Sequence, residues 1–333
     1  KLNTVIFFAS VAQFSNGFLN PHAYGPFSTT IAIAIFIVLL SSAWFTRDRI
    51  PTLPQPPADA KPFNALDFYR DLMQAFRNRN YLFLLIALFC LSMMLGLRGG
   101  LTFYMNLYYW ELSSADFGNV IIIGSLCGYV TGFFFSTKIH AVFDKRATIV
   151  ATCLALSVFP AMPVVLRMLG LFPENGSAYL VISIAAFGAL GTGAGSILNI
   201  SVMSALADVA DENALKYGIR QEGVIYSART FFAKLDNSIG HGIAAIALWL
   251  IAFPDKAIPG EVDANIISWI GLIDSPIAVV PGVIAAFFYA QYRIDKSTYN
   301  ETRRKLAVSR GETQGGPATV KAAGETGENE KAQ

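Results

Sequence analysis

The feature that most constrains this chain is a series of long apolar segments, most of them near the length that crosses a lipid bilayer. Windows of about 19 residues identify eight of them, at 4–18, 28–45, 81–109, 119–137, 147–170, 178–206, 223–253 and 266–292. A helical span needs about 20 mostly apolar residues, whereas the strands of a membrane barrel alternate over about 10. The sequence therefore predicts an all-α integral membrane protein.

Composition excludes several other classes of function. Charged residues make up only 14% of the 333 residues, against about 25% in soluble domains, and the net charge of +2 gives no indication of nucleic-acid binding. The three cysteines lack the spacing of a zinc or disulfide site, so we expect no metal. Because no H-E-x-x-H, G-x-S-x-G or P-loop motif is present, we expect neither an enzyme nor a cofactor.

The connectors between the apolar segments alternate in charge. One set holds nearly all the basic residues, and the other holds only Lys256. The basic set contains Arg47, Arg49, Lys61, Arg70, Arg77, Arg79, Lys138, Lys145, Arg146, Lys216, Arg220, Arg293, Lys296, Arg303, Arg304, Lys305 and Arg310. Because basic connectors stay on the cytoplasmic side of a membrane, the pattern predicts a multi-pass protein whose C-terminus is cytoplasmic.

The longest connector divides the chain into domains. Residues 1–45 hold the first two segments, and 46–80 form a cytoplasmic central loop that begins rich in proline and ends in an amphipathic helix, LDFYRDLMQAFRNRN. Residues 81–293 hold the other six segments. Residues 294–333 are predicted to be a cytoplasmic, largely disordered tail, because they contain few large apolar side chains.

Charged and polar residues interrupt the segment 223–253. A charge at mid-membrane costs about 2.5 to 3.5 kcal/mol, so such residues normally face a cavity or a partner. Seven residues advance a helix to about 20° short of two turns, so Lys234 and His241 share a stripe that includes Asn237, and Arg229 shares another with Asp236. The first stripe suits a water-filled pathway. The alternatives are a snorkelling lysine, a core histidine and an ion pair that only fixes packing.

Two other segments carry polar residues that could meet a ligand. Arg98 is followed by Tyr104 and further aromatic residues, which favours a polar ligand site but also fits an interfacial aromatic belt. Asn199 lies in a segment rich in glycine, where small residues permit close helix approach. Its amide could bind a hydroxylated ligand or join two helices.

A dense charged cluster joins the segments 178–206 and 223–253. We predict that Asp208, Asp211, Arg220 and Glu222, together with Arg229, form a cytoplasmic gate whose salt bridges break on opening. The alternative is a solvated loop between two spans.

This region also carries a family resemblance. ADVADENALKYGIRQEGVIYSARTFFAK is similar to the signature of the glycoside-pentoside-hexuronide:cation symporters, the melibiose-permease-like branch of the major facilitator superfamily. The matching residues are Asp208, Asp211, Gly218, Arg220, Glu222, Tyr226, Ser227 and Lys234. NPHAYGPF, TRDRIP and FDKR resemble other parts of the same family, and the similarity extends from residue 1 to about 306.

The resemblance implies a fold of twelve helices in two bundles that works by alternating access. The eight segments are then the fifth to twelfth helices, so the chain looks like a fragment that lacks roughly the first four. The implied activity is symport of a sugar or glycoside with Na⁺ or H⁺, with transport of lysolipids or other amphipathic solutes as the alternative. Lys234 is expected near the cation and sugar sites, although most of the cation site belongs to the absent helices. We expect a monomer in the bacterial inner membrane, with a small-molecule substrate and the bilayer as its partners.

Overall fold

The computed structural model describes residues 17–52, 65–217 and 222–294, together with 299, 301, 302, 304, 305 and 308. The described chain is helical. Its elements are η1 (Gly17–Leu19), α2 (Pro21–Thr46), η2 (Arg47–Thr52), α3 (Ala65–Phe76), α4 (Arg79–Tyr104), η3 (Met105–Tyr109), α5 (Ser114–Val142), α6 (Lys145–Val158), η4 (Phe159–Ala161), α7 (Met162–Met168), α8 (Ala178–Tyr217), α9 (Glu222–Leu250), α10 (Ala264–Leu272), η5 (Ile273–Ile277) and α11 (Ala278–Tyr289). The predicted segment 4–18, the proline-rich stretch and the tail after residue 308 lie mostly or wholly outside the described residues.

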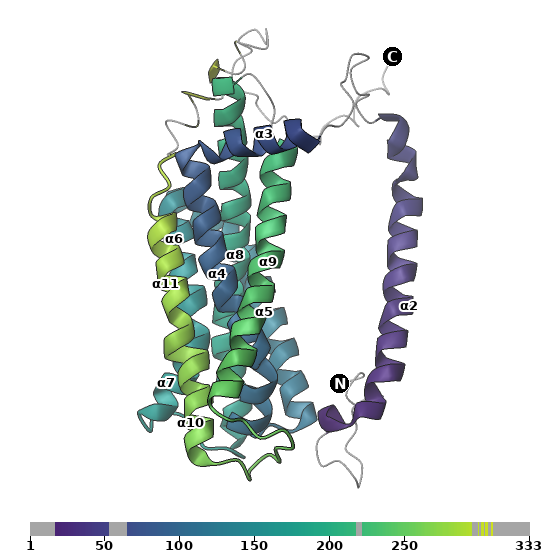
Figure 1. The fold of residues 1–333 in the computed structure, drawn as a ribbon, viewed down its shortest axis with the longest axis vertical. Coiled ribbons are helices and arrows are strands. Elements are labelled where there is room, and N and C mark those ends of the chain that lie inside the picture. Colours follow the sequence, from purple (N-terminus) through teal and green to yellow (C-terminus); the bar gives the residue numbers. More distant parts are fainter. Residues whose placement is uncertain are drawn as a thin grey trace, which may run out of the picture.

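The helices from α4 to α11 form one bundle (Figure 1). Its closest neighbours follow the order α9, α4, α11, α6, α8 and α5. The long helices run up and down, so the basic connectors meet at the end where α3 lies, and α7 lies at the other end (Figure 1). We call these the α3 end and the α7 end. The described connectors thus alternate between basic ones at the α3 end and ones with almost no basic residue at the α7 end, as the sequence predicts.

Glycine makes the contact between α5 and α8 close. A Cβ on Gly128 would lie 2.6 Å from Thr192 Cβ and 2.7 Å from the carbonyl oxygen of Ala189. One turn further, a Cβ on Gly132 would lie 2.9 Å from the carbonyl oxygen of Gly193. Helices in a bilayer associate by packing and interhelical polar contacts rather than by burial from water, so small residues at such positions decide which faces meet.

The contact between α4 and α9 follows the same rule. Gly240 of α9 faces Gly96 of α4, and a turn further Gly100 of α4 faces Ala244 of α9. The ring of His241 packs beside this crossing, against Gly99. The polar helix α9 is therefore held against the bundle by backbone contact at its middle.

Several segments that look continuous in the sequence are interrupted. Segment 147–170 becomes α6, η4 and α7, because Pro160 and Pro163 cannot donate helical hydrogen bonds. The π-helical turns η3 and η5 interrupt two others, the second at Pro276. Such turns appear often at functional sites, because an inserted residue re-aims the side chains around it.

The first part of the charged cluster after the segment 178–206, up to Tyr217, is helical rather than a loop. Helix α8 continues to Tyr217, so Asp208 and Asp211 lie on its last turns rather than in a short connector. The physical reason is local: the stretch ALADVADENALKY is rich in alanine and leucine, which favour helix, and contains neither glycine nor proline.

Helix α3 lies across the end of the bundle (Figure 1). Its Phe76 stacks on Tyr81 and meets Phe232 edge-on, with ring centroids 6.0 and 6.3 Å away. The opposite side exposes Leu66, Tyr69 and Met73. The predicted amphipathic helix is shorter than its sequence stretch, because Asn78 accepts from the backbone N–H of Asn80 and so caps the next helix.

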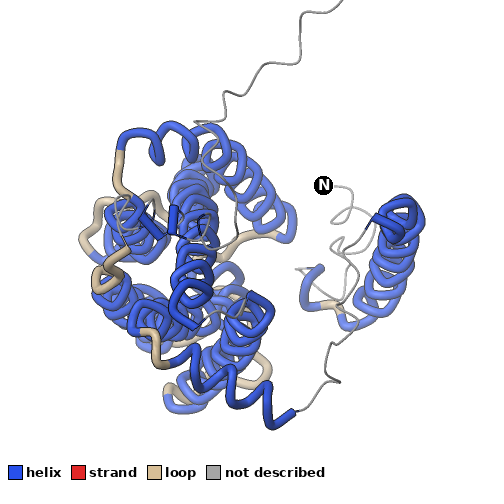
Figure 2. Tube along the Cα trace, turned by 90° about the horizontal axis from the view of Figure 1, so that it is seen from above, coloured by secondary structure: helices blue, strands red, loops and turns tan. Residues whose placement is uncertain are grey.

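Helix α2 stands apart from the bundle (Figures 1 and 2). No residue in its most apolar stretch of 18 residues is buried. It is joined to the bundle through η1, where the ring of Phe18 meets those of Phe103 and Phe117 at 6.1 and 5.1 Å.

Within the described residues, six helical stretches are long and apolar enough to cross a membrane. They are Pro21–Pro51, Arg79–Tyr109, Ser114–Val142, Lys145–Met168, Ala178–Lys216 and Ala264–Tyr289. Helix α9, which the sequence also predicts to cross, is not among them. It runs beside α4 over the same depth (Figure 1), so its polar residues set it apart from its neighbours.

The crossing of α4 and α9 generates a test of stability. A Cβ on Gly240 would lie 2.7 Å from Gly96 Cα and 2.8 Å from both the Leu97 nitrogen and the Met93 oxygen, all of them backbone atoms. We expect Gly240→Ala to lower the free energy of unfolding by about 1 to 3 kcal/mol, because the helices must separate. Thermal unfolding of the purified protein in detergent measures the change.

The matched control is Gly242→Ala, two residues further along α9. A Cβ there would have no atom within 4 Å, and alanine favours helix over glycine, so this variant should unfold at the wild-type temperature or above. Equal melting temperatures for the two variants would contradict the close contact at Gly240.

Candidate functional site

Three cavities follow one another along α8. The cavity nearest the α7 end has a volume of about 340 Å³, the middle cavity about 530 Å³ and the cavity nearest the α3 end about 230 Å³. Thr192 lines the first and second, and Ile200 lines the second and third. They therefore adjoin one another, and together they extend over most of the length of the bundle.

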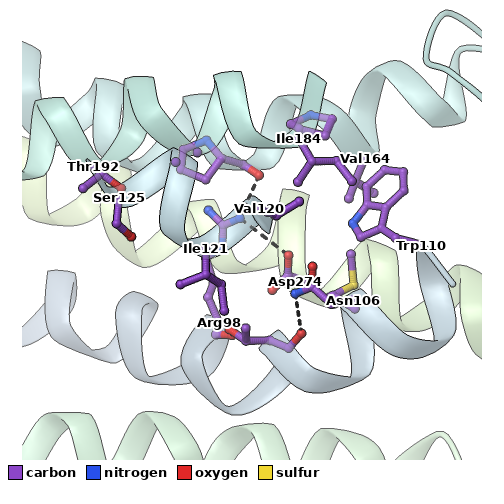
Figure 3. Close-up of a pocket in the computed structure, with 16 residues that line it drawn as sticks. Arg98, Asn106, Trp110, Val120, Ile121, Ser125, Val164, Ile184, Thr192 and Asp274 are labelled. Atoms are coloured by element: carbon purple, nitrogen blue, oxygen red, sulfur yellow. Dashed lines mark hydrogen bonds and ion pairs between the residues drawn. The ribbon is translucent and has the colours of Figure 1, made fainter. Parts of the chain in front are cut away.

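The cavity at the α7 end contains a buried ion pair. Arg98 of α4 lies 3.5 Å from Asp274, and the two side chains are 16% and 8% exposed (Figure 3). The guanidinium also donates to the carbonyl oxygen of Pro160 in η4 at 2.8 Å. A buried charge must find such partners or lose its ionised form, so Arg98 binds α4 to two other parts of the bundle.

Both π-helical turns contribute to this cavity. Asn106 lies in η3 and Asp274 in η5, and both side chains line it (Figure 3). Asn106 donates to the carbonyl oxygen of Thr102 at 2.7 Å. Arg98 was predicted from the sequence, whereas Asp274 was not. A signal was present, because this aspartate is the one acidic residue within the apolar segment 266–292.

The middle cavity contains the other predicted ligand residue, Asn199. Its Oδ1 accepts from Arg229 Nη2 at 3.1 Å. Arg229 and Tyr289, from α9 and α11, line the same cavity. The predicted pair between Arg229 and Asp236 stays a prediction, because the side chain of Asp236 lies outside the described part of the structure.

The cavity at the α3 end is bounded by Asp208 and Lys145. The Lys145 Nζ lies 2.5 Å from Asp208 Oδ2, and the hydroxyl of Tyr292 donates to the same oxygen at 2.9 Å. Burial, and then the Asp208 carboxylate, raise the pKa of Tyr292 above its ordinary value. His140 and Ser201 adjoin the pair, with Nε2 and Oγ 3.3 Å apart.

A second polar network lies at the same end. Asn78, at the start of α4, donates through Nδ2 to Glu212 Oε2 at 3.0 Å and to Asn213 Oδ1 at 2.8 Å. Asn80 donates to the same glutamate at 3.3 Å. The predicted acidic cluster therefore finds partners inside the bundle: Lys145 and Tyr292 bind Asp208, and the start of α4 binds Glu212.

Other predicted site residues lie elsewhere. Lys234 and His241 are on the exposed side of α9 rather than in the three cavities. Tyr104 belongs to an aromatic group, with its ring 6.1 Å from Tyr108 and 5.0 Å from Phe253. Asp211 is half-buried on α8. The side chains of Asn237, Arg220 and Glu222 lie outside the described residues, so their predicted roles stay predictions.

The ion pair between Arg98 and Asp274 generates a second test. Asp274→Asn leaves a buried guanidinium without its counter-charge, so we expect a loss of about 3 kcal/mol in the free energy of unfolding. The double variant Arg98→Met, Asp274→Asn removes both charges and should recover part of the loss. Thermal unfolding in detergent measures both variants.

The control is Asp48→Asn. Asp48 pairs with Arg47 at 3.7 Å, but the two side chains are 87% and 53% exposed, and exposed pairs contribute little. A double variant no more stable than Asp274→Asn would refute the view that the unpaired Arg98 causes the loss.

Comparison with known proteins identifies the family of this chain. No curated protein matches the chain. The model of one family, described as MFS/sugar transport protein, matches residues 2–296. That match includes α2, the whole bundle and every residue that lines the three cavities except Tyr299. This multi-pass all-α membrane protein therefore belongs to the MFS/sugar transport protein family and is a secondary transporter.

Proposed function

We propose that this protein is a cation-coupled symporter of a sugar or glycoside, of the melibiose-permease-like kind, that works by alternating access with Na⁺ or H⁺ as the coupling ion. The observation that carries the proposal is the row of three adjoining cavities along α8, each lined by a charged residue. A charge inside a membrane protein normally marks a pathway for a solute or ion. Arg98, Thr102, Asn106 and Asn199 supply polar groups to the row that suit hydroxylated solutes.

In this proposal the bundle moves as one body. The contacts of Asp208 with Lys145 and Tyr292 join α6, α8 and the chain after α11, and Asn78 joins α4 to α8. These contacts hold the α3 end rigid, which is what rocking of a whole bundle requires. Asp208, which the sequence analysis assigned to the gate, is proposed to serve this rigid role instead, and the gate is proposed to consist of Asp211, Arg220 and Glu222.

The exposed face of α9 is proposed to border the transport pathway. Lys234 and His241 are exposed there, and a lysine facing lipid at that depth would be costly. We assign Lys234 an electrostatic role beside the coupling cation, and place Asn237 and His241 along the same water-filled face. Tyr104 is proposed to lie near the entrance to the substrate pathway.

The proposed setting is the inner membrane of a bacterium, with the α3 end and the C-terminus in the cytoplasm. The described parts of the basic connectors lie at that end (Figure 1), which supports this orientation. The proposed partners are a small-molecule substrate and the bilayer, for a protein that works as a monomer without a cofactor.

A second candidate is transport of lysolipids or other amphipathic solutes. The middle cavity favours it, because apolar side chains supply much of its lining and one arginine supplies the charge. The apolar members are Leu88, Leu91, Leu95, Leu156, Leu198, Ile200, Val202 and Ala233. An acyl chain would contact these leucines favourably, whereas a sugar would leave many of them unused.

Uptake into proteoliposomes separates the two candidates. The purified full-length protein is challenged with a panel of radiolabelled glycosides and with lysolipids, under a Na⁺ gradient and an H⁺ gradient separately. We expect accumulation of a glycoside under one of the gradients, reversed when the gradient is reversed. Accumulation of lysolipid with no glycoside uptake would replace the first candidate by the second.

Lys234→Ala tests the role of the exposed face of α9. We expect coupled uptake to fall at least tenfold, because the charge beside the cation site is lost, while expression and melting temperature stay at the wild-type level. Phe231→Ala, an exposed change on the same helix, serves as the control. Wild-type coupling in Lys234→Ala would remove this lysine from the mechanism.

A further inference from the structure

The middle cavity contains a cation, Arg229, that has no counter-charge among the described residues. Arg229 points from α9 toward α8, where its Nη2 donates to Asn199. Its Nε is buried and has no hydrogen-bond partner. Among the described residues no carboxylate lies within ion-pair distance of Arg229, whereas Arg98 and Lys145 each have one. Arginine stays charged in proteins, so its positive charge faces the cavity.

A second buried donor lacks a partner in the same place. Tyr289 is 1% exposed, its hydroxyl is buried without a hydrogen-bond partner, and it lines the cavity with Arg229. An unsatisfied buried polar group costs about 1 to 3 kcal/mol. The cavity therefore carries two such groups, from two different helices, that a ligand could satisfy together.

The polar lining of this cavity consists of donors and neutral groups. Besides Arg229 and Tyr289 it includes Asn199 and the hydroxyl residues Ser92, Tyr129, Thr192 and Ser196, and no described lining residue is an aspartate or glutamate. The Nε and Nη2 of an arginine lie on one edge of the guanidinium, and this edge matches the two oxygens of a carboxylate or phosphate. The cavity of about 530 Å³ is large enough for such a group on a sugar-sized solute.

We propose that Arg229, Tyr289 and Asn199 form a binding site for an oxyanion, a carboxylate or phosphate carried by the transported solute. Arg229 supplies the charge and one edge of donors, and the hydroxyl of Tyr289 donates from a second helix, α11. This inference rests on the proposed transport function and deepens it, because it selects acidic sugars or anionic lysolipids over neutral solutes. It moves Arg229 from the predicted cytoplasmic gate to the ligand site.

Equilibrium binding to the purified full-length protein in nanodiscs tests the site without requiring transport. Three pairs of radiolabelled probes differ only in the anionic group or its absence: D-glucuronate against D-glucose, D-glucose 6-phosphate against D-glucose, and lysophosphatidate against the monoacylglycerol with the same acyl chain. We expect at least one anionic probe to bind about tenfold more tightly than its neutral counterpart. The first two pairs indicate a sugar source and the third a lipid source.

The variants then assign the preference to the site. Arg229→Gln should abolish the difference between the anionic and neutral probes, and Tyr289→Phe should reduce it severalfold. Arg229→Lys keeps the charge without the fork of donors and should retain part of the preference. Arg146→Gln, which removes an exposed charge outside the cavity, should leave it unchanged. If Arg229→Gln does not give a monodisperse protein, Arg229→Lys and Tyr289→Phe carry the test.

Two results would overturn the proposal. One is equal binding of every anionic probe and its neutral counterpart by the wild-type protein, which would indicate that water satisfies Arg229. The other is a preference that survives in both the Arg229 and the Tyr289 variants, which would place the anion elsewhere. Binding that follows these expectations without any uptake would instead retain the site and remove the proposed transport activity.

Discussion

The close approach of α8 to its neighbours is the contact on which the cavities depend. Glycines of α5 let that helix touch the backbone of α8 on one side, and Gly191 and Gly195 of α8 meet Pro160 and Leu156 on the other. A bilayer gives no hydrophobic reason for helices to associate, so contacts between small residues determine which faces meet. The cavities lie along these contacts, because Pro160, Thr192 and Leu156, which take part in them, also line the first two cavities.

The charges within the bundle fall into two classes by how they are compensated. Asp274 forms an ion pair with Arg98, and Asp208 forms an ion pair with Lys145 and accepts a hydrogen bond from Tyr292. These contacts bind helices together. Arg229 has an amide and no carboxylate among the described residues. Paired charges in a low-dielectric interior add rigidity at a cost in desolvation, whereas a charge without a counter-charge is suited to a ligand that supplies one. The same bundle can therefore be rigid at its two ends and able to bind a ligand at its middle.

The fold followed from the sequence more closely than the site did. Apolar length located the six described spans, and the alternation of basic connectors agreed with the two ends of the bundle. The interruptions at Pro160 and at the π-helical turns were not predicted from the sequence, because a hydropathy window of about 19 residues averages over them. Of the predicted ligand residues, Arg98 and Asn199 line cavities, while Lys234 and His241 lie on an exposed face. Helical periodicity places residues on a common face but does not say what that face meets.

The sequence by itself determined that this chain is a helical membrane protein. It also determined which helix ends lie on the same side of the membrane and which residues are costly to expose to lipid. These properties depend on composition and length along the chain. The tertiary structure alone decided that Arg98 pairs with Asp274 and that Asp208 pairs with Lys145. It also decided that Arg229 lines the middle cavity. Partners distant in sequence depend on which helices become neighbours. That choice rests on small residues distributed over several helices, such as Gly128 against Ala189 and Gly240 against Gly96, whose complementarity appears only when the backbones are packed together.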